Sequence, residues 1–192
     1  MSADAIFNVT QAFRMRLEEA LNGAGTVFVG PLDDPDAKGA SLVLFLYRIA
    51  PNASLRNSEH RVISNKPPND VIIYDNSLPL VLHYLVTVGT LAGSAEDPLL
   101  QLLGRAIRRL NDDPELTGVK VGHDTVRVTL EPLSTEEMSR IWTLFPVANY
   151  RTSVAYIASP VWIDPEEPPV PAARVIEDRL DAGVKIGEPA DV

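Results

Sequence analysis

The sequence contains no cysteine. A disulfide framework, a thiolate metal site and a cysteine nucleophile are therefore excluded, which fits folding in a reducing cytoplasm. Long apolar runs are also lacking, and the longest, Leu42 to Tyr47, is far shorter than the roughly 20 residues that cross a bilayer. Neither a basic nor an apolar segment opens the chain, so we predict no signal peptide and a soluble intracellular protein without a membrane partner.

Positive charge is scarce. The chain has 17 lysines and arginines against 26 aspartates and glutamates, a formal net charge of −9. Residues 164–192 hold eight acids and three bases, a net of −5, so the remainder carries −4. A protein that binds duplex DNA needs a basic face to displace counterions from phosphate. We therefore expect protein partners and no nucleic acid.

Groups suited to catalysis are few and scattered. The three histidines, His60, His83 and His123, are far apart, and no pair has the spacing of metal ligands. We interpret His83, on a predicted strand, as a partly buried structural residue. The acidic residues 33–36 lack the glycine and glutamate of a calcium loop. The sequence therefore predicts no catalytic residue, no cofactor and no metal site.

Apolar periodicity predicts three helices and five strands. The helices are expected at residues 4–22, 97–110 and 134–145, and the strands at 26–29, 41–49, 80–88, 126–130 and 152–163. Because helices and strands interleave, we predict an α/β (α+β) fold in which helices flank a mixed sheet. The strand at 41–49 is apolar on both alternations, which favours a central position.

Two helix starts carry capping signals. Asp97 precedes Pro98, an N-cap residue followed by a proline at the first helical position. Ser134 is followed three residues later by Glu137, which is the pattern of a capping box.

Two features remain that the fold alone does not explain. Residues 50–76, 27 in number, show no periodicity, and a long structureless segment in a small domain is usually a binding loop or disordered. Arg105, Arg108 and Arg109 share one face of their predicted helix. That face either is solvated and balances nearby acids, or contacts an acidic protein surface through bidentate pairing.

Five stretches together resemble one protein family. They are residues 44–57, 79–87, 103–106, 126–134 and 150–156. Their order along the chain and their residues are similar to those of the amino-terminal domain of cap proteins of contractile injection particles, of the antifeeding-prophage and virulence-cassette type. The resemblance covers roughly residues 5 to 164. The first stretch is the most specific, because an aromatic strand running into Pro51-Asn52-Ala53 and then Leu55-Arg56-Asn57 has no generic structural cause.

The resemblance implies a structural, non-enzymatic role. Such caps are similar in fold to phage tail-terminator proteins, with helices on a mixed, mostly antiparallel sheet. They are expected to form a homohexameric ring on the distal end of the inner tube, to stop its polymerisation and to anchor the last sheath layer. The implied partners are further copies of the chain, the tube protein and the sheath protein. Assembly is expected in the cytoplasm, after which the cap becomes part of the particle.

The same resemblance sets the predicted domains and interface. Residues 1–164 form the cap domain, and residues 165–192 form a proline-rich, acidic tail that the resemblance does not cover. The predicted protein-interface residues are Asn52, Leu55, Arg56, Asn57, Arg105, Arg108 and Arg109. Alternatively, the two asparagines only satisfy backbone groups of the loop and Leu55 pins the loop to the core. The alternative function is a cytosolic adaptor or ligand-binding module of the same fold, outside the ring.

Overall fold

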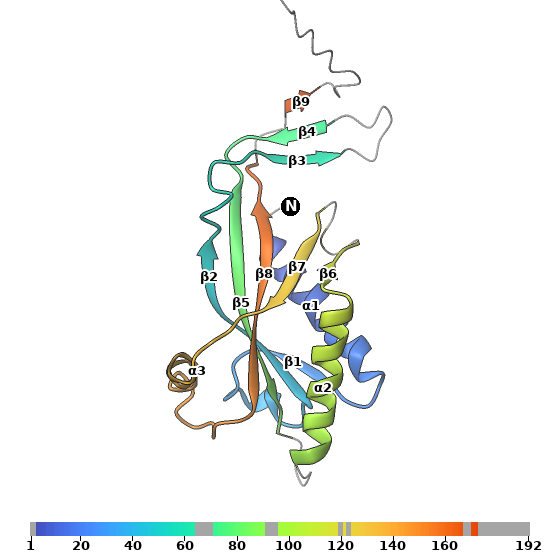
Figure 1. Cartoon of the computed structure of the whole chain (residues 1–192), viewed down its shortest axis with the longest axis vertical. Helices are drawn as coiled ribbons and strands as arrows, with labels where there is room; N and C mark the ends of the chain where they lie inside the picture. The colour runs from blue at the N-terminus through green and yellow to red at the C-terminus, as the bar shows by residue number, and fades with distance from the viewer. Residues whose placement is uncertain are drawn as a thin grey trace, which may run out of the picture.

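A mixed sheet forms the centre of the computed structural model, which describes residues 3–63, 71–90, 96–118, 121, 124–166 and 170–172. The strand order in this main sheet is β1-β2-β5-β8-β7-β6 (Figure 1). The strands are β1 Val27–Val29, β2 Leu42–Pro51, β5 Leu78–Val88, β6 Glu115–Leu116, β7 Val126–Leu130 and β8 Ser153–Ile163. Only the β1–β2 pair is parallel, so the predicted mixed, mostly antiparallel sheet is confirmed.

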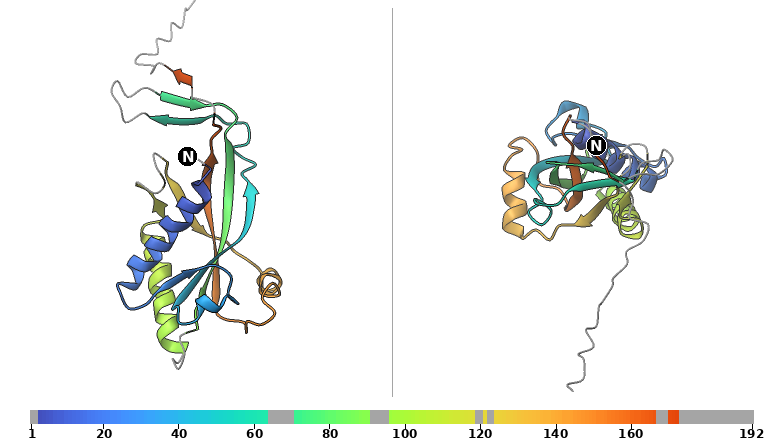
Figure 2. Two further views of the ribbon diagram at one scale, coloured as in Figure 1. Left: turned by 180° about the vertical axis from the view of Figure 1, so that it is seen from behind. Right: turned by 90° about the horizontal axis from the view of Figure 1, so that it is seen from above.

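Helices cover both faces of the main sheet. Helices α1 (Ala5–Leu21) and α2 (Glu96–Asp112) lie on one face, and α3 (Thr135–Trp142) lies on the other (Figure 2). A short 3-10 helix, η1 (Pro35–Ala37), follows β1. The capping box at Ser134 is present as predicted. Asp97 is not a cap, because α2 begins one residue before it. Of the described helices, none is long and apolar enough to cross a membrane.

The larger core lies between α1, α2 and the main sheet. The buried stripe of α1 includes Val9, Phe13 and Leu17, as its periodicity predicts. Phe13 packs edge-to-face against Tyr84 and Tyr156, with ring centroids 5.2 and 5.9 Å away. Edge-to-face pairs add about 0.5–1.5 kcal/mol each beyond the area that they bury. The aromatic cluster around Phe13 therefore fixes α1 on the sheet.

A smaller core lies on the opposite face. Ile141, Trp142 and Phe145, from α3 and the turn after it, pack against Leu85 of β5. The ring of Phe145 meets Phe45 of β2 at 5.0 Å, nearly perpendicular. Helix α3 is only eight residues long, so tertiary packing on this apolar strip stabilises it more than intrinsic propensity does.

The central position belongs to β5, and not to the predicted strand 41–49. Strand β5 pairs with β2 on one side and with β8 on the other. Strand β2 has β1 beside residues 42–44 only, and its later residues Arg48 and Ile49 are exposed. The apolar pattern of β2 reflects two covered faces over its first half. Leu42 and Leu44 face the core beneath α1 and α2, and the opposite face packs against η1 and α3.

The predicted structureless loop at residues 50–76 is wrong. Strand β2 continues to Pro51, and two further strands follow, β3 (His60–Ile63) and β4 (Val71–Tyr74). With β9 (Val170–Ala172) they form a second, three-stranded antiparallel sheet in the order β3-β4-β9. This second sheet lies beyond the end of β5 at which the strand begins (Figure 1). Strand β9 also lies beyond the predicted domain boundary at residue 164.

Replacing Phe13 by alanine tests the aromatic core. The change leaves a cavity between Tyr84 and Tyr156, so we expect the free energy of unfolding to fall by about 3–5 kcal/mol. The matched control is Phe7→Ala on the same helix, since Phe7 is 62% exposed and its loss should cost less than about 0.5 kcal/mol. Urea denaturation followed by circular dichroism measures both. Equal effects of the two substitutions would contradict the packing described.

Candidate functional site

The turn between β2 and β3, residues 52–59, contains four of the predicted interface residues. Asn52 anchors it. The backbone N–H of Asn52 donates to the Pro79 carbonyl at 2.8 Å, and its side-chain amide donates to the Ser159 hydroxyl at 3.0 Å. Its side-chain oxygen accepts from the Ser54 N–H at 3.1 Å. These contacts support the structural alternative for Asn52, and its role in an interface stays a prediction.

The rest of the turn divides into an inner and an outer part. Leu55 is half-buried, and its N–H and carbonyl both take part in turn hydrogen bonds, to Asn52 and from Ser58. Arg56 and Asn57 are exposed, and neither has a hydrogen bond or ion pair among the described residues. Of the four predicted residues, Arg56 and Asn57 are the ones whose side chains are available to a partner.

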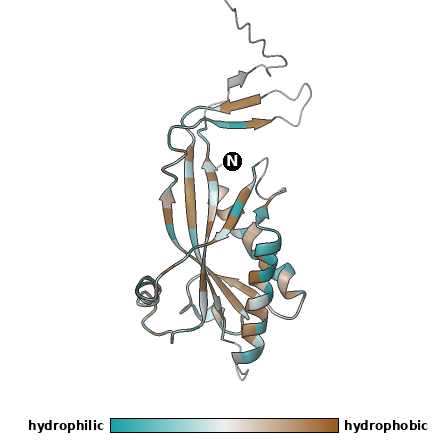
Figure 3. Cartoon of the chain, viewed as in Figure 1, coloured by the Kyte–Doolittle hydropathy of each residue, from teal (hydrophilic) through white to brown (hydrophobic). Residues whose placement is uncertain are grey.

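The second sheet is apolar on both faces. One face holds His60, Val62, Ile72 and Tyr74, and the other holds Arg61, Ile63, Val71 and Ile73. Apolar residues fill β4, whereas β3 begins with two polar residues and ends with two apolar ones (Figure 3). Ile63 is 63% exposed, although it belongs to a strand. Together with the half-buried side chains of β4, Ile63 makes this projecting sheet a candidate interaction surface.

An ionic cluster joins the second sheet to the main sheet. His60, which is only 3% exposed, lies between two carboxylates. Its Nδ1 is 2.6 Å from Asp164 Oδ1, and its Nε2 is 2.8 Å from Asp124 Oδ1. The imidazole ring stacks on Trp162 with centroids 4.7 Å apart, and the Ser77 hydroxyl donates to Asp164 at 2.8 Å. We call His60, Asp124 and Asp164 the histidine latch.

The histidine latch favours the protonated imidazole. Burial opposes the charged ring and lowers the pKa of His60, but hydrogen bonds to Asp124 and Asp164 and their negative charges outweigh burial. The pKa of His60 therefore lies above its ordinary value of about 6.5. Burial raises the pKa of Asp164, and hydrogen bonds, among them those from Ser77 and His60, overcome burial and bring that pKa below its ordinary value. Only an imidazolium donates from both ring nitrogens, as this geometry requires.

Sequence reasoning missed the histidine latch. His60 appeared isolated because its partners lie 64 and 104 residues away in the chain. An alternation of His60 with Val62 was the only local signal that His60 belongs to a buried strand face. His123 lies outside the described residues.

The second buried histidine is used inside the fold. His83 Nδ1 lies 2.9 Å from one carboxylate oxygen of Glu131, and the Tyr47 hydroxyl donates to the other at 2.6 Å. Burial and the hydrogen bond to Glu131 raise the pKa of Tyr47 well above its ordinary range. These contacts fasten β2, β5 and the segment after β7, in keeping with the predicted structural role of His83.

The arginine face of α2 is partly used within the fold. Arg109 pairs with Glu19 of α1 at 3.2 Å and with Asp113 at 3.4 Å. Arg108 has only a long contact of 3.5 Å with Asp112, and its side chain is 86% exposed. Arg105 is exposed and has no partner in the part of the chain that the structure describes. The structure does not bring this face to the β2–β3 turn, because α2 packs over the half of the main sheet that is remote from the second sheet (Figure 1).

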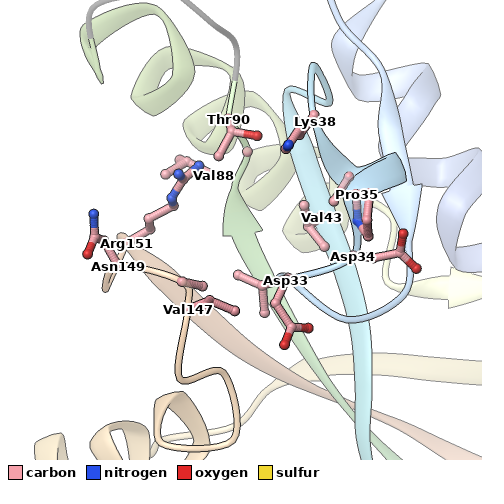
Figure 4. A pocket seen from close by; sticks show the side chains of 14 residues that line it. Asp33, Asp34, Pro35, Lys38, Val43, Val88, Thr90, Val147, Asn149 and Arg151 are labelled. Atoms are coloured by element: carbon pink, nitrogen blue, oxygen red, sulfur yellow. The ribbon is translucent and has the colours of Figure 1, made fainter.

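A cavity of about 340 Å³ lies at the far end of the main sheet from the second sheet. Figure 4 shows Asn149 and Arg151 on one side of it and Asp33 and Asp34 on the other, with Lys38 at the top of the view. Asp34 caps η1 by accepting from the Asp36 N–H at 2.9 Å, as expected of an acidic turn. Opposite charges of equal number line this cavity, so it shows no preference for an anion or a cation. Within the described ranges, no group of three or more suitable side chains is arranged to hold a metal ion.

The helix-flanked mixed sheet is similar in fold to two solved tube-terminating caps. A family model described as the Pvc16 N-terminal domain matches residues 8–177, and the chain belongs to this family. No curated protein sequence matches the chain.

Two solved structures are similar to the chain, and both were determined by cryo-EM. One is the PVC sheath/tube terminator of an extracellular contractile injection system in the extended state, with 17% identity and a TM-score of 0.61 over 95% of this chain and 65% of the other. The second is the tube-terminating cap of the anti-feeding prophage, with 19% identity and a TM-score of 0.61 over 90% of this chain and 59% of the other. The chain thus spans less than two thirds of the length of either structure.

Asn52→Ala tests the anchor of the β2–β3 turn. The substitution removes the hydrogen bonds to Ser159 and Ser54, so we expect the free energy of unfolding to fall by about 1–2 kcal/mol. Amide exchange of Leu55 and Ser58 should become faster as the turn loosens. Asn57→Ala, an exposed asparagine in the same turn, is the matched control and should leave exchange unchanged. Protected amides in the Asn52 variant would show that other contacts hold the turn.

Proposed function

We propose that the chain is the structural cap, or tail terminator, of a contractile phage-tail-like injection particle. In this role it forms a ring on the distal end of the inner tube, stops tube polymerisation and anchors the last sheath layer. The match of residues 8–177 to the Pvc16 N-terminal domain carries the proposal, and the likeness in fold to two tube-terminating caps supports it. The role is structural, without a reaction to catalyse.

Formation of a ring requires a surface that fits a different surface of the next copy. The two faces of the main sheet differ in the way that such a heterologous contact needs. On one side α1 exposes Phe7 and Met15, and on the other the turn after α3 exposes Leu144 and Val147. Contact between unlike faces gives a ring where the rotation from copy to copy closes and a filament where it does not, and we propose a closed ring of six copies.

The second sheet and the β2–β3 turn are proposed to contact the particle. Ile63 supplies an exposed apolar side chain, and Arg56 supplies a charge with no partner among the described residues. Both lie at one end of the molecule, so a ring of copies would present them as a circle toward the tube or the sheath. Assembly takes place in the cytoplasm, and the ring then becomes a component of the extracellular particle.

The mass of the protein in solution tests the ring. Light scattering behind size-exclusion chromatography should detect a species of about six subunits, alone or when the cognate tube protein is supplied. Electron microscopy should then show shorter tubes as the ratio of cap to tube protein rises. A monomer that leaves tube length unchanged would contradict the proposal and favour an adaptor of the same fold.

Arg56→Glu tests the contact through the β2–β3 turn. Reversal of an exposed charge should leave the free energy of unfolding within about 0.5 kcal/mol of the parent, because Arg56 has no partner among the described residues. We expect at least a tenfold loss of affinity for tube ends, measured by biolayer interferometry. Arg140→Glu, on the exposed face of α3, is the matched control. Equal losses for the two variants would indicate a nonspecific charge effect.

A further inference from the structure

We infer that the histidine latch is operated by a proton: it fixes the second sheet on the main sheet while His60 carries a charge, and frees it when His60 becomes neutral. The latch is a property of the chain alone, whereas its effect on a partner rests on the proposed function. His60, Asp124 and Asp164 are thus positioning residues, which act on a partner through the orientation of the β2–β3 turn and of Ile63.

Three separate segments meet at the latch. His60 is the first residue of β3 and belongs to the second sheet. Asp164 directly follows β8, and Asp124 precedes β7, so both carboxylates are held by strands of the main sheet. Ser77, just before β5, donates to the same Asp164 oxygen that faces His60. The side-chain contacts of His60 therefore cross from one sheet to the other.

Proton loss removes one of the two charged hydrogen bonds. With the imidazolium present, Nδ1–H donates to Asp164 and Nε2–H donates to Asp124, at 2.6 and 2.8 Å. When one proton leaves to solvent, one nitrogen turns a lone pair toward a carboxylate oxygen, and the net charge of the three groups falls from −1 to −2. The loss of this hydrogen bond and of the positive charge weakens a buried interaction between charged groups, which is destabilising.

The other groups that face His60 do not take over its charge. Trp162 stacks on one side of the ring and does not titrate. Tyr74 of β4 stacks at 5.7 Å, and burial together with the nearby carboxylates raises its pKa, so it stays neutral while His60 titrates. The Ser77 hydroxyl is neutral at all relevant pH values. Asp124 and Asp164 are the charged groups of the described segments that contact the ring.

The direction of the pH dependence follows from the two pKa shifts. The pKa of His60 is raised, so the stability that it contributes is complete below the unfolded value of about 6.5 and is lost as pH rises through the folded pKa. The pKa of Asp164 is lowered, so its contribution is lost only as pH falls below its ordinary value toward the folded pKa. The latch is therefore closed at mildly acidic pH and opens as pH rises through the folded pKa of His60, which lies above about 6.5.

The second sheet is small enough for this release to matter. Its strands have four, four and three residues, fewer than the usual number of about five or six, and therefore make few hydrogen bonds with one another. The main sheet, with its two cores, does not depend on the latch. Release should therefore loosen the second sheet while the rest of the domain stays folded.

The test is amide exchange by NMR or mass spectrometry across pH 6 to 10, corrected for the intrinsic pH dependence of exchange. Protection of residues 60–63 and 71–74 should fall at least tenfold as the His60 ring signals titrate, while α1 and β5 keep theirs. Asp124→Asn removes one neighbouring charge and should move the midpoint down by about one pH unit. His60→Gln should abolish the pH dependence, and His83→Gln, the other buried histidine, should preserve it.

Two results would overturn the latch. One is constant protection of the second sheet through the titration of His60 in the parent protein. This measurement does not depend on the folding of a variant. The other is an unchanged midpoint in the folded Asp124→Asn variant. The same pH series with tube protein separates this inference from the proposed function: tube binding absent at every pH would contradict the cap role and leave the latch standing, because the exchange measurement uses the chain alone.

Discussion

The burial of β5 on both faces is the constraint on which the structure depends. Tyr84 and Leu82 project into the core beneath α1 and α2, and Leu85 projects into the cluster beneath α3. Strand β5 also pairs with β2 and β8 on its two sides. Each helix is therefore held by side chains of one strand, and a displacement of β5 would disturb both cores together.

The same strand also sets the place of the candidate interface. Strand β5 begins directly after Ser77, whose hydroxyl reaches Asp164 at the end of β8. The two longest strands of the sheet thus converge where the second sheet departs. The β2–β3 turn is tied to these strands as well, through the contacts of Asn52 with Pro79 and Ser159. A rigid main sheet therefore orients two short and exposed elements.

Periodic segments were predictable because their signal is local. The α1 stripe around Phe13 and the capping box at Ser134 each lie within a few residues, and both are as predicted. The sequence did not predict the second sheet, because β3 and β4 have four residues each, too few to show a clear period. Its third strand, β9, lies about 100 residues further along the chain than β4. The sequence also assigned the central position to strand 41–49. An apolar pattern indicates that both faces of a strand are covered, but it does not indicate how many strands lie on either side of it.

The candidate site shows how one sequence motif mixes two kinds of residue. Within the segment that carries the family resemblance, the side chain of Asn52 makes hydrogen bonds within the domain, whereas Arg56 and Asn57 are exposed to solvent. Arg109 and Arg105 differ in the same way, because Glu19 of α1 lies within reach of Arg109 only. Sequence spacing places such residues on a common turn or helix face, but which of them finds a partner depends on elements that are distant in the chain.

The histidine latch is better understood as a device for orientation than as a source of stability. Moving three ionisable groups out of water costs several kcal/mol per ion, and apolar packing of similar volume is often as stabilising. What an apolar contact lacks is direction, whereas hydrogen bonds from two ring nitrogens to two carboxylates fix the plane of the imidazole and hence the start of β3. A ring of identical subunits needs that fixed direction in every copy, because a surface that meets a partner around a circle has to stand at one angle throughout.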